Sequence, residues 1–368
     1  QQPTRSDASF FFKSIELFLL TSTYKVRISY SWIVPLSSVY VEGDYIETVE
    51  GLLFAVKGVH HPTDRVIAYL RYVPDPSGER ERGEKRYKRV YDIDETTHFL
   101  RENYSHYLSE VDFLDKFLQT VPVKKISRLY EPRAAMQSIF KAPKTRLEQV
   151  MKSFISAIIA GSNVSLTSFG ISGSMLIGLV AEGSDIDLIV YGERNGLRTY
   201  NALKILREKK EIKPYDAESV KKVAKSRWGD TGIDLSNFMD IEMKKFLHGI
   251  YNDTEYFIRL VKTRNERREV SRPIQLVRGR AVISDDRLSI FTPCRYRVDK
   301  VTVIDPKIDY AVSELISYRG KFTEQAKKGD FIEFRGTLEE VEQANQKYFR
   351  IVLGGTGDYL VPVKLIDR

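Results

Sequence analysis

Two aspartates separated by one residue, Asp185 and Asp187, open an apolar stretch that is typical of a buried strand. Side chains alternate between the faces of a strand, so both carboxylates should point the same way while Ile186 points into the core. Two adjacent carboxylates repel each other unless a cation joins them, and Mg²⁺ is typically held by one or two carboxylates together with substrate phosphates. The spacing therefore predicts a divalent metal site.

A turn of small residues, 171–174, precedes these aspartates and leads into a short apolar helix predicted over residues 175–180. Ser172 and Ser174 carry hydroxyl groups, and Gly173 has no side chain to block an approaching anion. The N-terminus of a helix presents unpaired backbone N–H groups and the positive end of a dipole, which together favour phosphate. The stretch therefore predicts a phosphate cradle followed by a metal platform, the parts that nucleotidyl transfer needs.

The pattern Gly173-Ser174, ten further residues and Asp185-x-Asp187 resembles the signature of the DNA polymerase beta-like nucleotidyltransferase superfamily. The whole chain also resembles a group of predicted archaeal nucleotidyltransferases. The resemblance implies that Gly173 and Ser174, with the neighbouring Ser172, contact a nucleoside triphosphate. It further implies that Asp185 and Asp187 hold two Mg²⁺ ions, with Mn²⁺ as an alternative, and that a later strand supplies a third catalytic carboxylate.

The third carboxylate is expected near a strand predicted over residues 255–261. Two candidates lie there, Glu255 and Asp253, and Asp253 is expected in the turn that precedes the strand. We choose Glu255, which shares a strand face with Phe257 and Arg259. Arg259 would either lie near the triphosphate or pair with a carboxylate. The third carboxylate being absent is the remaining alternative.

The expected activity is Mg²⁺-dependent transfer of a nucleotidyl group from a triphosphate to an acceptor hydroxyl, with release of pyrophosphate. The net charge of +8 favours a polyanion, so RNA or DNA is the expected acceptor, although a basic surface also serves solubility. One alternative is a non-catalytic nucleic-acid-binding protein that retains the fold. A second is a glycosyltransferase whose Asp-x-Asp holds Mn²⁺ and a sugar nucleotide, which the Gly-Ser turn disfavours.

Composition sets further limits on this protein. A chain of 368 residues should form two or three domains. The single cysteine, Cys294, excludes a disulfide framework and a cysteine-rich zinc site, and it fits a reducing, cytoplasmic location. The apolar segment 10–20 is too short to cross a membrane and contains Lys13 and Glu16, so no membrane partner is expected.

We expect an α+β fold in which a central nucleotidyltransferase-type mixed sheet with helices lies between two strand-rich units. The predicted domains are an N-terminal α+β domain over residues 24–140, a nucleotidyltransferase domain over 141–265 and a β-rich domain over 274–368. The expected strands outside the motif are 25–30, 52–58, 66–73, 274–283, 288–304, 331–341, 348–353 and 359–365. The last five predict a small barrel or sandwich.

Helices are predicted from Asp94, over 108–120, from Tyr130, and over 144–160, 196–210, 216–227, 236–248 and 310–318. Gly161 should end the helix 144–160, and Ser236 should cap the helix 236–248.

Three polar segments lie between these elements. The loop 75–86 has mixed charges and is expected to be a solvated hairpin tip, with a substrate loop as the alternative. His60 and His61 are expected in a surface turn. The segment 262–273 is expected to be a solvated linker or a contact for phosphate groups, and its arginines are Arg264, Arg267, Arg268 and Arg272.

Overall fold

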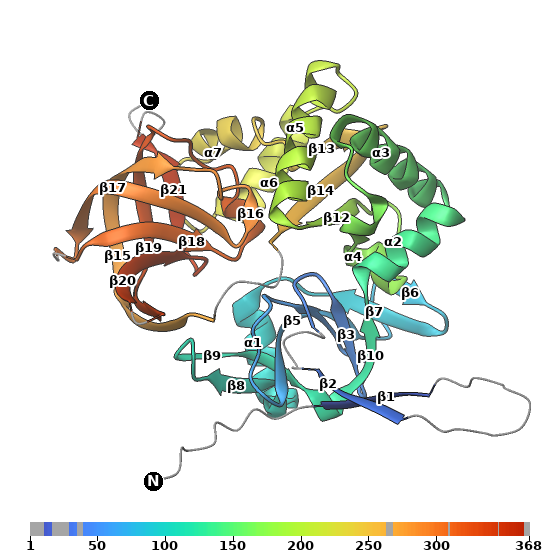
Figure 1. Ribbon diagram of the computed structural model, residues 1–368. Helices are drawn as coiled ribbons and strands as arrows, with labels where there is room; N and C mark the ends of the chain where they lie inside the picture. The colour runs from blue at the N-terminus through green and yellow to red at the C-terminus, as the bar shows by residue number, and fades with distance from the viewer. Residues whose placement is uncertain are drawn as a thin grey trace, which may run out of the picture.

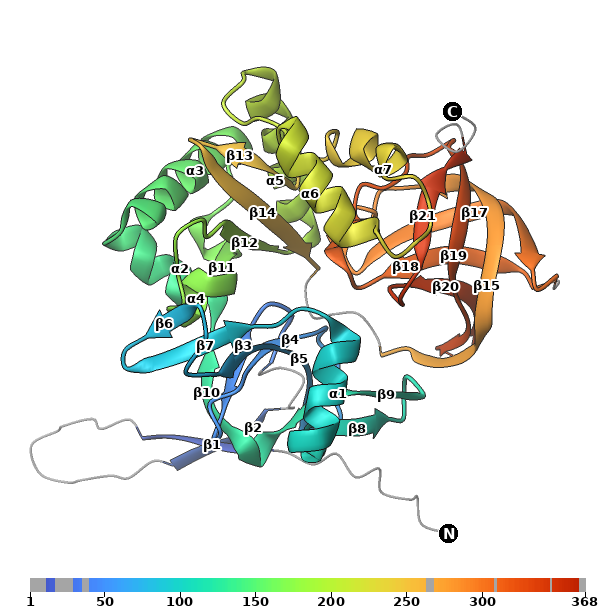
Figure 2. The same ribbon diagram turned by 180° about the vertical axis from the view of Figure 1, so that it is seen from behind.

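The computed structural model describes residues 11–16, 29–34, 40–262, 268–307, 310–344 and 346–363. The chain builds a strand-rich N-terminal unit, a central mixed sheet with helices, and a C-terminal β unit, so the predicted α+β class is confirmed. In Figure 1, and in the reverse view of Figure 2, the C-terminal unit lies beside the central unit and the N-terminal unit lies below both. Two further strands, β1 (Phe11–Glu16) and β2 (Ser29–Val34), pair with each other in antiparallel fashion.

The N-terminal sheet follows the order β10-β3-β4-β5-β7-β6, and β9 joins it by pairing with both β5 and β8. The helix α1 (Ile93–Asn103) begins after Asp92, whose side chain accepts a hydrogen bond from the backbone N–H of Glu95. The strands are β3 (Tyr45–Thr48), β4 (Leu53–Val56), β5 (Arg65–Pro74), β6 (Arg80–Arg82), β7 (Lys85–Arg89), β8 (Leu108–Val111), β9 (Lys116–Pro122) and β10 (Ile126–Tyr130).

The predicted helix over residues 108–120 is wrong, because this segment forms the hairpin of β8 and β9. A turn divides the segment: the backbone N–H of Leu114 donates to the carbonyl of Val111, and Asp115 has a φ of 49°. That left-handed conformation is incompatible with a continuous right-handed helix. Pairing of β9 with β5 then outweighs the helix-like spacing of the apolar residues.

His61 is buried, so the predicted surface turn is wrong for this residue. Its Nδ1 accepts a hydrogen bond from the backbone N–H of Ile67, and its Nε2 lies 3.2 Å from the carbonyl oxygen of Tyr40. Since Nδ1 is an acceptor, the proton belongs on Nε2, which donates to Tyr40. Both ring nitrogens are thereby satisfied inside the N-terminal unit. Of the predicted strand 25–30, residues 25–28 lie outside the described residues.

The central sheet follows the order β11-β12-β14-β13, in which β12 and β14 are parallel. Its strands are β11 (Phe169–Ile171), β12 (Ile186–Tyr191), β13 (His248–Tyr251) and β14 (Thr254–Val261). The short strand β16 (Phe291–Thr292) pairs with the end of β14, and Phe291 is fully buried in the core of the central unit. The helices of this unit are α2 (Pro132–Lys141), α3 (Arg146–Ser162), α4 (Gly173–Ile177), α5 (Glu193–Glu208), α6 (Ala217–Trp228) and α7 (Leu235–Glu242).

Two helix ends differ from the prediction. Helix α3 continues past Gly161 and ends at Asn163, which adopts a left-handed conformation. Helix α7 is capped by Asp234 rather than Ser236, and it stops well before residue 248 because His248 opens β13. Single 3₁₀ turns elsewhere in the chain lie at Ser105–Tyr107, Val123–Lys125, Leu166–Ser168 and Gly320–Phe322.

The C-terminal unit is a closed barrel. The pairing order β15-β17-β18-β20-β19 returns to β15, and β21 adds to β19 outside this ring. Closure leaves no free edge among the five ring strands, as in other small barrels. The strands are β15 (Val270–Asp285), β17 (Cys294–Asp305), β18 (Val312–Ser317), β19 (Phe331–Gln343), β20 (Gln346–Leu353) and β21 (Tyr359–Pro362).

The predicted helix over residues 310–318 is also wrong, because residues 312–317 form β18. This strand joins β17 to β20, so the barrel closes only when the segment is extended. Val312, Leu315 and Ile316 are buried there. The tertiary context therefore decides the conformation of a segment whose apolar spacing suits a helix equally well.

No helix in the described ranges is both long enough and apolar enough to cross a lipid bilayer. From the apolar segment 10–20, residues 11–16 form the strand β1.

Candidate active site

Asp185 and Asp187 lie at the start of the central strand β12. Asp187 is the second residue of that strand, Asp185 directly precedes it, and Ile186 between them is fully buried. Both aspartates line a cavity of about 800 Å³ to which all three units contribute. Because alternate residues of a strand share a face, the two carboxylates are presented to this cavity together.

The turn before α4 is in direct contact with β12. The backbone N–H of Ser172 donates to the backbone carbonyl of Asp187 at 2.9 Å. Gly173 has a φ of +59°, and a Cβ atom at this position would lie 1.9 Å from Asp187 Oδ2. Only glycine therefore fits at position 173, because any side chain would collide with the carboxylate.

The two serines of this turn have different surroundings. Ser172 lines the cavity, and its hydroxyl donates to the backbone carbonyl of Gly43 in the N-terminal unit at 3.3 Å. Ser174 is 6% exposed inside the five-residue helix α4 and is not among the residues that line the cavity. The side chain of Ser172, the N-cap residue, makes no capping hydrogen bond to the first backbone N–H groups of α4. The structure thus brings Ser172 and Gly173, but not the Ser174 side chain, to the aspartates.

The surroundings of Asp187 disfavour its negative charge. Its burial and the neighbouring Asp185 carboxylate raise the pKa of Asp187 to about 7, although Arg259 and Arg89 act in the opposite direction. A divalent cation between the two carboxylates would remove this repulsion. Two carboxylates that open to one cavity fit one Mg²⁺ that is shared with substrate phosphate oxygens.

Glu255 lies beside this site rather than in it. Ile186 pairs with Tyr256 and Asp187 with Phe257 across the parallel strands, so Glu255 is the neighbour of Asp185. Glu255 is exposed and is not among the residues that line the cavity. Partial burial, followed by the Asp185 charge, raises the pKa of its carboxyl group.

The described part of the chain contains no cluster of three or more His, Cys, Asp or Glu side chains suited to a metal ion. Asp253, the other candidate for the third carboxylate, lies in the turn between β13 and β14 with a φ of 57°. Among the described residues, Asp185 and Asp187 therefore have no third carboxylate placed to share a metal ion with them, and a second metal ion would need a ligand from elsewhere.

A turn of the N-terminal unit packs onto the same face of β12 and brings Glu42 into the cavity. Glu42 Oε1 accepts from Arg259 Nη1 at 2.7 Å and from Lys57 Nζ at 3.2 Å. Burial favours a raised pKa for Glu42, but Lys57 and Arg259 outweigh it and lower the pKa below its usual value. A Cβ on the next residue, Gly43, would lie 2.0 Å from Ile189 Cδ1, so the turn sits directly on the strand. Arg259 thus pairs with a carboxylate, one of the two predicted options.

The predicted solvated loop 75–86 is wrong for Arg80 and Arg82, which form part of strand β6. Arg80 is 8% exposed, and its Nη1 donates to Ser184 Oγ at 2.8 Å and to the carbonyl of Leu179 at 3.2 Å. Arg82 Nη1 donates to the carbonyl of Ile177 at 3.2 Å. Both arginines therefore hold the end of α4 and the loop that leads to Asp185. All three residues of β6 are charged, so the sequence offers no apolar alternation that would have indicated a strand here.

The charged segment 262–273 connects β14 to the barrel strand β15. Arg264 and Arg267 lie outside the described residues. Arg268 lines the cavity, and its guanidinium lies 5.0 Å from the ring centroid of Phe113. Arg272 is exposed on β15 and is not among the lining residues. One arginine of this segment is thus placed where it faces the candidate site.

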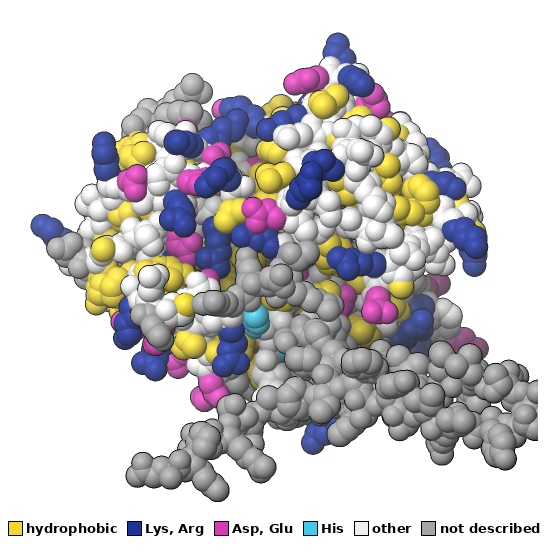
Figure 3. Space-filling model, in the orientation of Figure 1, with side chains coloured by type: hydrophobic (Ala, Val, Ile, Leu, Met, Phe, Trp, Pro, Cys, Tyr) yellow, Lys and Arg dark blue, Asp and Glu magenta, His cyan; other side chains and the backbone are white. Residues whose placement is uncertain are grey.

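The cavity lining is rich in basic and aromatic side chains. On the face shown in Figure 3, Lys and Arg side chains gather where the barrel meets the central unit. Six carboxylates line the cavity: Glu42, Asp185, Asp187, Glu269, Glu339 and Asp358. The cations of the lining are twice as many, namely Lys57, Arg71, Arg89, Lys116, Arg227, Arg259, Lys262, Arg268, Arg295, Arg319, Lys321 and Arg350. The excess of positive charge favours an anionic ligand.

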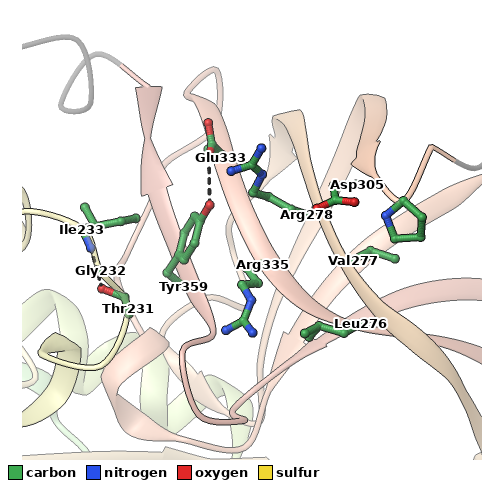
Figure 4. A pocket seen from close by; sticks show the side chains of 11 residues that line it. Thr231, Gly232, Ile233, Leu276, Val277, Arg278, Asp305, Glu333, Arg335 and Tyr359 are labelled. Carbon is green, nitrogen blue, oxygen red and sulfur yellow. Dashed lines mark hydrogen bonds between the residues drawn. The ribbon is translucent and has the colours of Figure 1, made fainter.

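A second hollow, of about 550 Å³, lies between the α6–α7 loop and the barrel (Figure 4). It shares no lining residue with the large cavity. Two of its polar side chains have hydrogen-bond partners: the Tyr359 hydroxyl donates to Glu333 at 2.8 Å, and Arg335 donates to the carbonyl of Thr356 at 3.1 Å. Of these two hollows, the large cavity is the one that has the aspartate pair and the excess of cations.

Residues 159–238 match the family model described as "Nucleotidyltransferase domain". This range includes the turn at residues 172–174 and both aspartates of β12, and it ends before Glu255. The chain is also 28% identical over 332 residues to "Uncharacterized protein MJ1086" of Methanocaldococcus jannaschii, an alignment that covers 85% of this chain and 95% of that protein. No solved structure matches the chain. The predicted resemblance to nucleotidyltransferases is confirmed for residues 159–238, and the resemblance of the longer chain to an archaeal protein is also confirmed.

Proposed function

We propose that this chain, which carries a domain of the nucleotidyltransferase family within residues 159–238, transfers a nucleotidyl group from a nucleoside triphosphate to an acceptor hydroxyl. Pyrophosphate is the second product, and Mg²⁺ is the cofactor. The acceptor is a nucleic acid, and the reaction takes place in the reducing compartment that the single cysteine indicates.

The observation that carries this proposal is the contact between the turn at Ser172 and Gly173 and the side of β12 that carries Asp187. Asp187 Oδ2 occupies the space that a side chain at position 173 would fill, and Ser172 is hydrogen-bonded to the backbone of the same aspartate. A phosphate group at this turn would therefore meet the carboxylates without any rearrangement of the backbone. Such fixed positioning of charge is the main source of catalysis in phosphoryl transfer.

The residues of the chain have separate tasks in this proposal. Ser172, Gly173 and the first backbone N–H groups of α4 receive the triphosphate, with Ser174 as part of the same turn. Asp185 and Asp187 hold the cofactor, and Glu255, the neighbour of Asp185, is the candidate for the third carboxylate. When bound, Mg²⁺ supplies charge neutralisation of phosphate oxygens and activation of the attacking hydroxyl.

One observation favours a second candidate function, a nucleic-acid-binding protein that retains the fold without catalysis. Glu255 is not among the residues that line the cavity, whereas cations dominate that lining. A polyanion would bind such a surface even if the carboxylates held no metal.

Isothermal titration with each of the four ribonucleoside triphosphates, with Mg²⁺ and then with EDTA, separates the two functions. The proposed enzyme binds at least one triphosphate in a Mg²⁺-dependent manner and transfers its labelled nucleotidyl group to material in total cellular RNA or DNA. Asp185→Asn combined with Asp187→Asn should lower turnover at least ~100-fold, since these groups hold the metal. Asp253→Asn in the exposed turn is the matched control. Full turnover by the double variant would refute the metal assignment.

A further inference from the structure

A cluster of cations with one carboxylate lies in the large cavity beyond Asp187. We call Lys57, Arg71, Arg259 and Arg319 the basic cluster. The N-terminal unit supplies Lys57 and Arg71, the central strand β14 supplies Arg259, and the barrel unit supplies Arg319 from the residues after β18. All four side chains line the same cavity as the two aspartates, so the cluster forms only where the three units meet.

The strand register places this cluster relative to the candidate catalytic groups. Asp187 pairs with Phe257, and two residues further along the parallel strands Ile189 pairs with Arg259. Arg259 therefore shares a sheet face with Asp187 and lies further toward the carboxyl end of the strands. The backbone N–H of Ser172 bonds the Asp187 carbonyl, so the proposed triphosphate turn lies at the other end of this face.

The cluster has too few carboxylates for its positive charge. Glu42 pairs with Arg259 and Lys57. Arg71 donates to the carbonyl of its neighbour Leu70, and Arg319 donates to the carbonyl of Gly354. In the parts of the chain that the structure describes, no carboxylate forms an ion pair with Arg71 or Arg319.

The surroundings of the cluster show the cost of this imbalance. Burial, together with the charges of Arg259 and Arg319, lowers the pKa of Arg71. Burial also lowers the pKa of Lys57 to about 8, with Arg259 and Arg71 contributing against the opposing effect of Glu42. The Nε of Arg259 is buried without a hydrogen-bond acceptor. Like charges that crowd one cavity, with one buried N–H group that lacks an acceptor, are stabilised when an anion binds between them.

We propose that the basic cluster binds a backbone phosphate of a single-stranded polynucleotide acceptor, next to the hydroxyl that is to be extended. This inference rests on the proposed function, because it assigns the triphosphate to the turn at Ser172 and the acceptor to the opposite side of Asp187. Arginine is the preferred partner of phosphate, since its guanidinium donates two parallel hydrogen bonds. An acceptor hydroxyl on a protein or a sugar would have no use for a second phosphate site.

Aromatic rings border the cluster where bases of such an acceptor would lie. Tyr69 is near enough to Arg71 and Arg319 for their charges to act against the rise in its pKa that burial causes. The guanidinium of Arg259 lies 5.9 Å from the ring centroid of Phe257. Both rings line the cavity. Proteins that bind single-stranded nucleic acids usually combine cationic side chains, which contact the phosphates, with aromatic rings on which the bases stack.

Fluorescence anisotropy with a labelled oligoribonucleotide of ten uridines tests the inference. Arg71→Gln with Arg319→Gln should weaken its binding at least ~10-fold and flatten the dependence of log affinity on log salt by about 0.7, as the loss of one phosphate contact requires. The matched control is Arg86→Gln with Arg280→Gln, which removes two arginines from the same two units outside the cavity. Arg319→Gln alone tests the case in which the partly buried Arg71 is needed for folding, because Arg319 is exposed.

Titration of the same variants with Mg²⁺ and the triphosphate that the wild type binds gives the second readout, which should change less than twofold. Parallel loss of triphosphate affinity would overturn the inference and assign the cluster to the triphosphate. The inference would also be overturned if the Arg71 and Arg319 substitutions left oligonucleotide affinity unchanged. It would equally be overturned if the wild type did not bind the oligonucleotide. If the wild type bound adenosine monophosphate as tightly as the oligonucleotide, the inferred polynucleotide acceptor would be wrong, and a mononucleotide would be the ligand of the basic cluster. Failure of the proposed function is distinct, because it abolishes Mg²⁺-dependent triphosphate binding in the wild type.

Discussion

Two carboxylates of the central unit, the partly buried Asp187 and the buried Glu242, differ in how the protein neutralises their charge. Asp187 faces Asp185, and its pKa is raised to about 7. Burial also acts to raise the pKa of Glu242, but Lys245, Arg227 and other neighbours outweigh it and hold the pKa at about 2.

The partners of Glu242 explain this difference. Its carboxylate accepts from Arg227 at 2.7 Å, from Lys245 at 3.0 Å and from the indole N–H of Trp228 at 3.1 Å. The protein thus neutralises Glu242 with its own side chains, whereas the described residues provide no comparable set of donors to the Asp187 carboxylate. A carboxylate of the first kind stabilises a fold, and one of the second kind is a candidate for binding a cation from outside.

Substitution of each carboxylate by its amide should give opposite results for stability. Glu242→Gln leaves Lys245 and Arg227 without their buried partner and should cost about 3–5 kcal/mol of unfolding free energy. Asp187→Asn removes repulsion and should leave the unfolding free energy unchanged or higher. Urea denaturation of both variants measures the contrast, with the exposed Glu218→Gln on α6 as the control. A loss for Asp187→Asn as large as that for Glu242→Gln would break the comparison.

Acid should unfold the protein partly through the Glu242 cluster. The folded pKa of Glu242 is about 2 against an ordinary 4.5, so its stabilisation is present above pH 4.5 and is lost as the pH falls toward 2. Burial and the Arg227 charge lower the pKa of His248 to about 3, so its contribution is lost in the same direction, between pH 6.5 and 3. The wild type should lose about 2–3 kcal/mol from Glu242. Urea midpoints at pH 7, 5.5, 4 and 3 measure this loss, which Glu242→Gln should lack below pH 4.5.

Substitution of Arg80 tests whether activity depends on a fixed position of the loop that precedes Asp185. Arg80→Gln removes the hydrogen bonds to Ser184 and Leu179, so the loop that carries Asp185 is less constrained. We expect kcat/KM to fall about tenfold, a loss of about 1.4 kcal/mol in transition-state stabilisation, together with a higher Mg²⁺ requirement. Arg80→Lys should restore part of the activity. Arg86→Gln on the exposed side of the same hairpin is the control, and an unaltered Mg²⁺ requirement in Arg80→Gln would contradict the positioning role.

Bound Mg²⁺ should neutralise the Asp187 carboxylate, as Lys245 and Arg227 neutralise Glu242, and should thereby stabilise the fold. At a Mg²⁺ concentration ten times its dissociation constant, the wild type should gain about 1.4 kcal/mol and melt a few degrees higher than in EDTA. The variant with asparagine at both 185 and 187 should show no shift. Thermal melting in buffers matched for ionic strength measures this, and an equal shift in both proteins would indicate non-specific binding.

The sequence was informative where chemistry and spacing are local. The turn at Gly173, the buried Ile186 and the strand that carries Asp187 are separated by few residues, so their pattern determines their relation. Glu42 and Arg80 reach the same site from more than 90 residues away, and no periodicity within one segment reports such contacts. The strand β18 was mistaken for a helix for a related reason, since its conformation depends on two partner strands distant in the chain.

The short strand β16 connects the barrel to the central sheet. Phe291 and Thr292 extend the sheet beside Leu260 and Val261, although their neighbours in the chain on both sides belong to barrel strands. A protein truncated before residue 274 would therefore lose this short strand and leave the end of β14, at Leu260 and Val261, without its partner on that side. Separately expressed halves should recover this sheet only by reassociating, so swapping the barrel between relatives would alter the enzyme core as well.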